Sequence, residues 1–148
     1  MTLEELCERH RRVALDSNVL VYLFESSGPS AERAVAVVNA ISGRRIVGVI
    51  SSVALTEVVV GPVLAGNDAM GERYVDALRS IENLQIVPVT VEIAAEAAFV
   101  RARTGLTLVD ALHVATARIA GASILVTSDR QIRPTAKLEV LQLDDLVA

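Results

Sequence analysis

Four carboxylates in this chain of 148 residues lie in surroundings where acidic side chains are unusual, because each one follows or interrupts an apolar stretch. They are Asp16, Glu57, Asp110 and Asp129. Gathered into one site, these carboxylates would repel each other unless a cation lay between them. Hard oxygen ligands favour Mg²⁺ or Mn²⁺, which keep bound waters and also bind substrate phosphate. Because such a metal activates water and stabilises displacement at phosphorus, the four acids together predict metal-dependent phosphodiester chemistry.

Glu57 has the strongest physical argument of the four. It lies in the segment Val-Ala-Leu-Thr-Glu-Val-Val-Val, and none of its neighbours three and four positions away on a helix can pair with it. A buried carboxylate without a partner is strongly unfavourable or must take up a proton. Its partner must therefore come from elsewhere in the fold, either an arginine such as Arg101 or a metal ion.

Asp16 and Asp129 share a second pattern, in which an apolar segment is followed by an acid. The apolar segments are 13–15 and 124–126, and both have the composition of buried strands. Ligands of parallel sheets bind beyond the carboxyl ends of the strands, where both acids would lie. Taken alone, Asp16 could equally cap a helix and Asp129 could be an ordinary turn aspartate.

Asp110 begins a predicted helix. Thr107 and Asp110 have the spacing of a capping box, with aspartate in place of the usual glutamate or glutamine. An acid in the first turn also suits the helix dipole, and this structural role is compatible with a metal role if the helix start points at the site. His113 follows on roughly the same face, where we expect a packed or hydrogen-bonded histidine.

Apolar strands alternate with helices along the chain. We expect strands at 13–15, 46–50, 84–89 and 123–126, with a weaker one at 139–143. We expect helices at 18–24, 30–41 with Ser30 as the N-cap, 52–61, 72–81, 90–103 and 108–120, with a loop at 66–71. Because the strands are continuously apolar, they favour a parallel sheet covered by helices on both faces.

The organisation expected from this pattern is one domain over residues 1–148, because no repeat or linker interrupts it. Residues 1–12 form a polar N-terminal extension, in which we expect His10 to be solvated. The segment 46–66 has a single charge, but its small and polar residues and its central acid favour a strand followed by a helix over a membrane span.

The composition excludes some classes of protein and leaves others open. Hydrophobic residues make up 52% and charged residues 22%, so global disorder is excluded. The net charge of −4 argues against binding nucleic acid through a broad basic surface. All the basic residues except Lys137 are arginines, which suit bidentate phosphate contacts. A single cysteine, Cys7, cannot form an internal disulfide and fits a reducing cytoplasm.

Four segments resemble, in order, the acidic motifs of PIN domains. They are Val-Ala-Leu-Asp-Ser-Asn-Val-Leu-Val-Tyr at 13–22, Ile-Ser-Ser-Val-Ala-Leu-Thr-Glu-Val at 50–58, Leu-Val-Asp-Ala-Leu-His-Val-Ala-Thr-Ala at 108–117 and Val-Thr-Ser-Asp-Arg at 126–130. The resemblance implies a three-layer α/β/α fold with a central parallel sheet. It also implies cleavage of RNA with Mg²⁺ or Mn²⁺ at the four acids, with Ser17 and Thr127 as supporting hydroxyls.

The size and build of the chain are most similar to VapC toxins of bacterial toxin–antitoxin pairs. This similarity implies a cognate antitoxin and a homodimer. Arginines near the acids could hold the RNA phosphates, or else pair with those acids when no metal is bound; the candidates are Arg101, Arg103 and Arg130. The alternatives are a non-catalytic PIN-fold interaction module and a PIN nuclease of RNA processing. A phosphatase of the haloacid dehalogenase type is disfavoured, because Asn18 stands where it would need a second aspartate.

Overall fold

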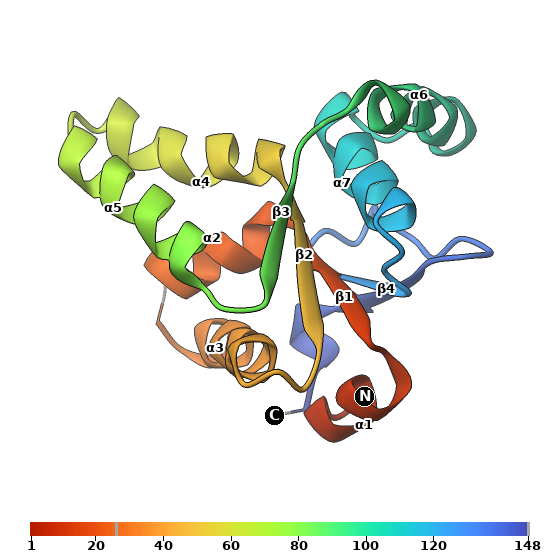
Figure 1. The fold of residues 1–148 in the computed structure, drawn as a ribbon, viewed down its shortest axis with the longest axis horizontal. Helices are drawn as coiled ribbons and strands as arrows, with labels where there is room; N and C mark the ends of the chain where they lie inside the picture. Colours follow the sequence, from red (N-terminus) through yellow and green to blue (C-terminus); the bar gives the residue numbers. More distant parts are fainter. Residues whose placement is uncertain (26, 148) are drawn as a thin grey trace.

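A central sheet of five parallel strands organises the protein (Figure 1). The structure is a computed structural model that describes residues 1–25 and 27–147. The strands are β1 (Arg12–Leu15), β2 (Val47–Ser51), β3 (Leu84–Val87), β4 (Ile124–Thr127) and β5 (Glu139–Gln142), in the spatial order β3-β2-β1-β4-β5. All the strand pairs are parallel, so the sheet predicted from the apolar runs is confirmed.

Helices cover both faces of the sheet and complete a three-layer α/β/α fold (Figure 1). The helices are α1 (Leu3–Arg9), α2 (Ser17–Glu25), α3 (Pro29–Ser42), α4 (Ser52–Leu64), α5 (Asp68–Ser80), α6 (Val91–Thr104) and α7 (Leu108–Ile119), with a 3₁₀ turn at Leu143–Asp145. Helices α6 and α7 pack together on one face, while α2 and α3 cover the other. The segment 46–66 is therefore β2 and α4, and no helix among the described residues is long and apolar enough to cross a membrane.

Successive residues of the strands face opposite layers, which divides the interior into two hydrophobic cores. In β1, Val13 and Leu15 belong to the core under α2 and α3, whereas Ala14 belongs to the core under α6 and α7. All three are almost fully buried. The strand is continuously apolar because its successive side chains are buried in two different cores, one on each face of the sheet.

Several helix boundaries differ from the predicted ones. Helix α3 begins at Pro29 with Gly28 at the N-cap, because proline suits the first helical position better than the predicted cap, Ser30. Helix α4 continues through Pro62 to Leu64 and does not end at the proline. The predicted loop at 66–71 is shorter, because the side chain of Asn67 caps α5.

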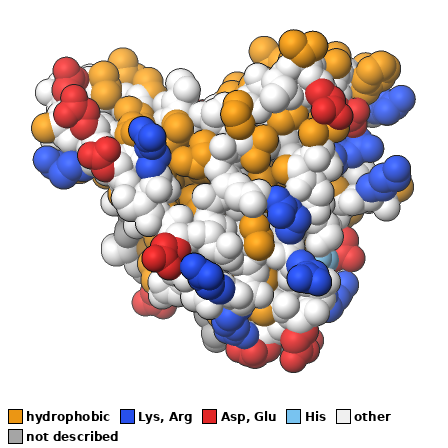
Figure 2. Space-filling view, viewed as in Figure 1, with side chains coloured by type: hydrophobic (Ala, Val, Ile, Leu, Met, Phe, Trp, Pro, Cys, Tyr) orange, Lys and Arg blue, Asp and Glu red, His pale blue; other side chains and the backbone are white. Residues whose placement is uncertain are grey.

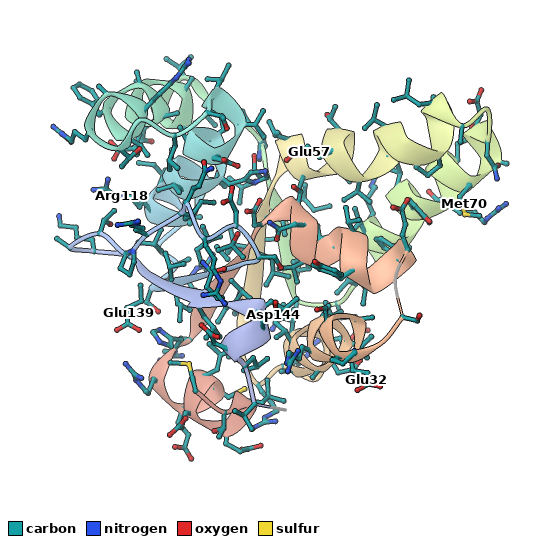
Figure 3. All side chains as sticks on the ribbon, turned by 180° about the vertical axis from the view of Figure 1, so that it is seen from behind. Glu32, Glu57, Met70, Arg118, Glu139 and Asp144 are labelled. Carbon is teal, nitrogen blue, oxygen red and sulfur yellow. The ribbon has the colours of Figure 1, made fainter. Side chains whose placement is uncertain are left out.

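The N-terminal extension is part of the fold. Thr2 and Glu5 form a capping box for α1, and Leu6 of α1 is fully buried in the core. The expectation that His10 is solvated is wrong. Its ring is buried, with Nδ1 2.6 Å from Ser123 Oγ and Nε2 3.2 Å from a carboxylate oxygen of Glu139, a residue labelled in Figure 3.

Burial lowers the pKa of His10 below its ordinary value, against the opposing effect of the Glu139 carboxylate. The unfolded chain therefore binds a proton more readily than the folded one as the pH falls through about 6.5. We expect the wild type to be more stable than His10→Asn near neutral pH and to lose this advantage on acidification. Thermal unfolding of both proteins at pH about 7.5 and about 5.5 measures this difference. An advantage that grows as the pH falls would contradict the prediction.

Candidate functional site

The candidate site lies at the carboxyl ends of the central strands. The chain runs from β1 to β2 and β3 on one side, then returns to β4 and β5 on the other side of β1. The carboxyl end of β1 is therefore the point where the strand order reverses, which is where open α/β sheets bind their ligands. Asp16 follows β1 at this point, and Thr127 is the last residue of the neighbouring strand β4.

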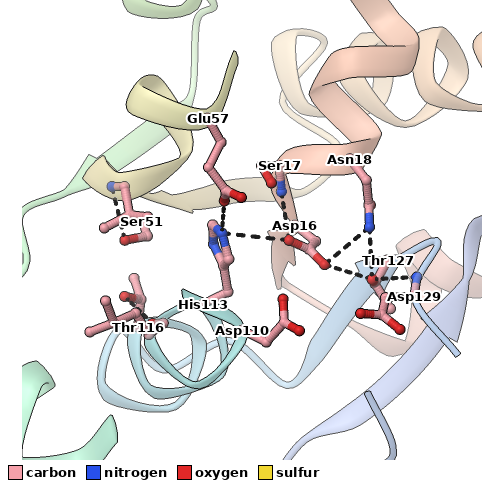
Figure 4. A network of polar contacts seen from close by, with 12 residues as sticks. Asp16, Ser17, Asn18, Ser51, Glu57, Asp110, His113, Thr116, Thr127 and Asp129 are labelled. Carbon is pink, nitrogen blue, oxygen red and sulfur yellow. Dashed lines mark hydrogen bonds and ion pairs between the residues drawn. The ribbon is translucent and has the colours of Figure 1, made fainter. Parts of the chain in front are cut away.

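Asp16 is held in one orientation by hydrogen bonds to both carboxylate oxygens (Figure 4). The backbone N–H of Ser17 donates to Oδ1 at 2.8 Å, and the hydroxyl of Thr127 donates to Oδ2 at 2.7 Å. Asp16 is only 2% exposed. Its carboxylate is therefore fixed before any ligand arrives. Thr127 contacts it through the hydroxyl expected from the resemblance, whereas Ser17 contacts it through the backbone N–H.

Asn18 is a contact residue that sequence analysis did not single out. Its side-chain amide donates to Asp16 Oδ2 at 3.2 Å, and its carbonyl oxygen accepts from the backbone N–H of Ser128 at 3.1 Å. Asn18 thus ties β1's acid to the loop after β4. The segment Asp-Ser-Asn shows that Asn18 is close to Asp16 in the chain. Its contact with Ser128, 110 residues away, could not be inferred from the neighbouring residues.

Glu57 finds its partner in His113. Glu57 Oε1 lies 2.6 Å from His113 Nε2, which is also 3.6 Å from Asp16 Oδ1. Glu57 comes from α4, the helix after β2, and His113 comes from α7, the helix before β4 (Figure 4). The hydrogen-bonded histidine expected from the sequence is confirmed, and Arg101 is not the partner.

The environment of His113 favours its charged form. Burial lowers its pKa, but the hydrogen bond to Glu57 and the negative charges of Asp16, Glu57 and Asp110 outweigh it, so the pKa is raised overall. For Glu57, burial acts in the opposite direction and raises the pKa. The hydrogen bonds from His113 and the Ser17 hydroxyl outweigh burial, so the pKa of Glu57 is below its ordinary value. In its charged form, His113 would offset part of the negative charge that converges here.

Asp110 lies in the first turn of α7 and faces the same region (Figure 4). Its backbone N–H donates to the Thr107 hydroxyl at 3.3 Å, so the threonine caps the helix as predicted. The pKa of its carboxyl is raised, first by burial and then by the negative charges of Asp16 and Asp129, despite the opposing effects of Thr107 and His113. The helix start does point at the other acids.

Asp129 closes the group from the loop after β4. Its backbone N–H donates to Thr127 Oγ1 at 3.0 Å, and its Oδ1 accepts from the backbone N–H of Gln131 at 2.9 Å. Asp129 thus makes the hydrogen bonds of an ordinary turn aspartate, and its carboxylate is also close enough to Asp110 to influence the pKa of that residue. The structure brings all four sequence-predicted acids to one edge of the sheet.

The arginines predicted to hold phosphate make no ion pair with these acids in the described part of the chain. Arg103 lies over the ring of Phe99 at 5.3 Å, and Arg130 is 3.5 Å from Asp145. Arg101 is exposed near the end of α6. Within the described residues, His113 is the single basic group paired with the acids.

The donor set fits a divalent cation. One ligand atom each from Asp16, Glu57 and His113 lies within 4.8 Å of the others. Asp110 and Asp129 add carboxylates whose mutual repulsion no arginine or lysine offsets among the described residues. Oxygen-rich sites of this kind suit Mg²⁺ or Mn²⁺.

Comparisons with known proteins agree with this arrangement. The model of the PIN domain family matches residues 13–138. A search of curated proteins finds no match.

Solved structures share the fold at low sequence identity. A toxin–antitoxin complex from Klebsiella pneumoniae is 23% identical with a TM-score of 0.67, and the match covers 88% of this chain and 97% of that one. DNA-bound VapBC from Salmonella typhimurium is 17% identical, with a TM-score of 0.70 and coverage of 89% and 98%. FitAcB from Neisseria gonorrhoeae is 19% identical, with a TM-score of 0.69 and coverage of 90% and 99%.

The raised pKa of Asp110 makes a prediction about the metal-free protein. Its ionised carboxylate is disfavoured by burial and by its acidic neighbours, so Asp110→Asn should stabilise the fold at neutral pH when a chelator is present. We expect the melting temperature to rise by about 2–4 °C, which corresponds to about 1 kcal/mol in a chain of this length. Asp76→Asn, at an exposed position of α5, is the matched control and should have little effect. A lower melting temperature for Asp110→Asn alone would contradict the repulsion.

Proposed function

Because the chain belongs to the PIN domain family, we propose that it is a metal-dependent ribonuclease, and that it serves as the toxin of a type II toxin–antitoxin pair. The observation that carries the proposal is the cluster of four acids at the carboxyl ends of β1 and β4, with no arginine or lysine paired to its three aspartates among the described residues. A cluster of this composition is suited to a cation and a phosphate together.

Asp16, Asp110, Asp129 and Glu57 are the residues that would hold Mg²⁺ or Mn²⁺. The bound ion supplies Lewis-acid activation of water and stabilises the charge that develops on the phosphate during displacement. Thr127 and Asn18 hold the Asp16 carboxylate in place, so that little reorganisation accompanies substrate binding. The 2.6 Å contact between His113 Nε2 and Glu57 Oε1 holds this carboxylate near Asp16. The proposed products carry a 5′-phosphate and a 3′-hydroxyl.

Three arginines are proposed to hold the RNA backbone on either side of this site. Arg101 and Arg103 lie in the last turn of α6, and Arg130 immediately follows Asp129. All three are exposed, so their guanidinium groups are free to move toward a phosphate. Concentrating cations beside the acids would compensate for the negative net charge of the chain.

The toxin role is supported by the structures that share the fold. One of them is a toxin–antitoxin complex, and two others, VapBC2 from Rickettsia felis and VapBC from Salmonella typhimurium, are bound to DNA. A protein partner would also account for the apolar side chains that gather on both raised lobes of the molecule in Figure 2. Exposed hydrophobic residues of the helices there include Leu64 of α4, Val91 and Phe99 of α6, and Leu108 of α7. We propose that a cognate antitoxin and a second copy of the chain cover parts of this surface, and that the protein acts in the cytoplasm.

Replacement of Asp16 tests the catalytic proposal. We expect Asp16→Asn to reduce the rate of RNA cleavage by more than about 100-fold. Replacing a residue that only hydrogen-bonds to a metal ligand already lowers metal affinity or activity by about 10–100-fold. The measurement is the rate of cleavage of a mixed-sequence RNA by purified protein with Mg²⁺ or Mn²⁺. Asp76→Asn should cut like the wild type. Undiminished cleavage by Asp16→Asn would remove Asp16 from its proposed role.

Metal binding separates an active nuclease from a non-catalytic module of the same fold. Binding to the folded state alone raises stability, so the melting temperature of the wild type should increase with Mn²⁺, approximately with the logarithm of its concentration above the Kd. The increase should be much smaller for Asp110→Asn and Asp129→Asn, and unchanged for Asp76→Asn. No shift with Mn²⁺ in the wild type would favour the non-catalytic module.

A further inference from the structure

A cavity of about 480 Å³ opens beside the acids, between the loop after α6 and the loop after β4. Its lining residues are Thr104, Gly105, Leu106, Val114, Gln131, Arg133, Pro134 and Thr135. Apart from Thr104, the last residue of α6, and Val114 of α7, they come from two loops, and loops are where the binding residues of a rigid scaffold tend to lie. None of the predicted phosphate-binding arginines lines it, so the proposed catalytic function leaves it without a role.

Two direct links join this cavity to the candidate site. Val114 lies four residues after Asp110 in α7, and residues at this spacing are neighbours on one helix face. Gln131 is closer still, because its backbone N–H donates to Asp129 Oδ1 at 2.9 Å. A chain whose phosphate lies at the acids therefore has this cavity directly beside it.

The chemistry of the lining suits a nucleobase. Leu106, Val114 and Pro134 offer apolar contact, and the Gln131 amide can meet the polar edge of a base. The guanidinium of Arg133 is a planar cation, and unpaired RNA bases stack on such groups. No carboxylate lies among these lining residues, although acids crowd the neighbouring site. The volume is within the range of about 300–1,000 Å³ typical of small-molecule pockets.

The Thr135 hydroxyl adds a polar group to the same wall. Its Oγ1 is buried and has no hydrogen-bond partner among the described residues. Buried hydroxyl groups are nearly always satisfied, so a rotation of this side chain that turns Oγ1 toward the cavity would let a ligand supply the missing partner.

We propose that this cavity receives one unstacked base of the RNA, next to the phosphodiester that is cut, and that Gln131 and Arg133 set the base preference of cleavage. The proposal rests on the ribonuclease function and extends it to the choice of substrate. A phosphate at the acids places the adjoining nucleotide here, which favours RNA over a peptide of a partner protein as the occupant.

The test compares Gln131→Ala and Arg133→Ala with the wild type and with Arg79→Ala, an exposed arginine of α5 far from the lining. Both lining residues are exposed, so folding should be retained, and thermal unfolding confirms it. A random-sequence RNA pool is cut with Mn²⁺, and the cleavage sites are mapped by sequencing. We expect the preference at one position beside the cut to fall about 5-fold or more in both variants, and to persist in Arg79→Ala.

An abasic nucleotide at that position provides a second arm. Removal of the base should slow the wild type at least to the rate of Arg133→Ala, and should slow Arg133→Ala by a smaller factor, because Gln131 and the apolar lining still meet the base in that variant. If the wild type cuts RNA while both lining variants keep its preference at every position, the proposal is overturned, the ribonuclease function stands, and a peptide becomes the better occupant.

A binding measurement separates this proposal from the ribonuclease function if the wild type cuts nothing. Adenosine, cytidine, guanosine and uridine 5′-monophosphates are titrated into the wild-type protein, and backbone amide shifts are followed by NMR. Shifts confined to the lining residues, and weakened in Arg133→Ala, would support a base site even though the nuclease proposal had failed. Absence of such shifts in a protein that cuts no RNA would overturn both.

Discussion

Repulsion between carboxylates is the constraint on which the rest of this structure depends. Besides burial, the negative charges of Asp16 and Asp129 raise the pKa of Asp110. No arginine or lysine among the described residues pairs with these three aspartates. Such an arrangement persists only if other interactions hold each acid in place. The hydrogen bonds of Thr127, Asn18 and Ser17 do this for Asp16, while helix capping does it for Asp110.

The parallel sheet provides the rigidity that this constraint requires. Its strands are buried on both faces, so the carboxyl ends of β1 and β4 are fixed relative to each other by two hydrophobic cores. The acids themselves lie just beyond the strands or on the helices that pack against them. His113 lies between Glu57 and Asp16, and its raised pKa favours the charged form that would relieve part of the negative charge. A cation would relieve the remainder, which is why the geometry supports a metal-dependent activity.

Much of the fold and the acidic cluster could be predicted from the sequence, because both depend on local patterns. Continuous apolar runs indicated the parallel strands, and an acid after such a run indicated a position at the sheet edge. The partner of Glu57 could not be predicted in the same way, since His113 is 56 residues away in the chain and either an arginine or a metal would have satisfied the same carboxylate. The burial of His10 was missed because its own segment is polar. The available signal was the helical spacing of Leu3, Leu6, Cys7 and His10, which places all four on the side of α1 that meets the core.

The hydrogen bond between Thr127 and Asp16 joins residues 111 positions apart, and this separation has a consequence for synthesis. On a ribosome, the N-terminal acids emerge first, but Asp16 has no neighbouring strand β4 to fix it until most of the chain has been made. The candidate site is therefore assembled late, after Asp110, His113 and Thr127 have all been translated. A nascent or truncated chain that stops before β4 lacks the geometry of the finished site, so any hazard that its activity poses to the cell begins only after Thr127 has been translated.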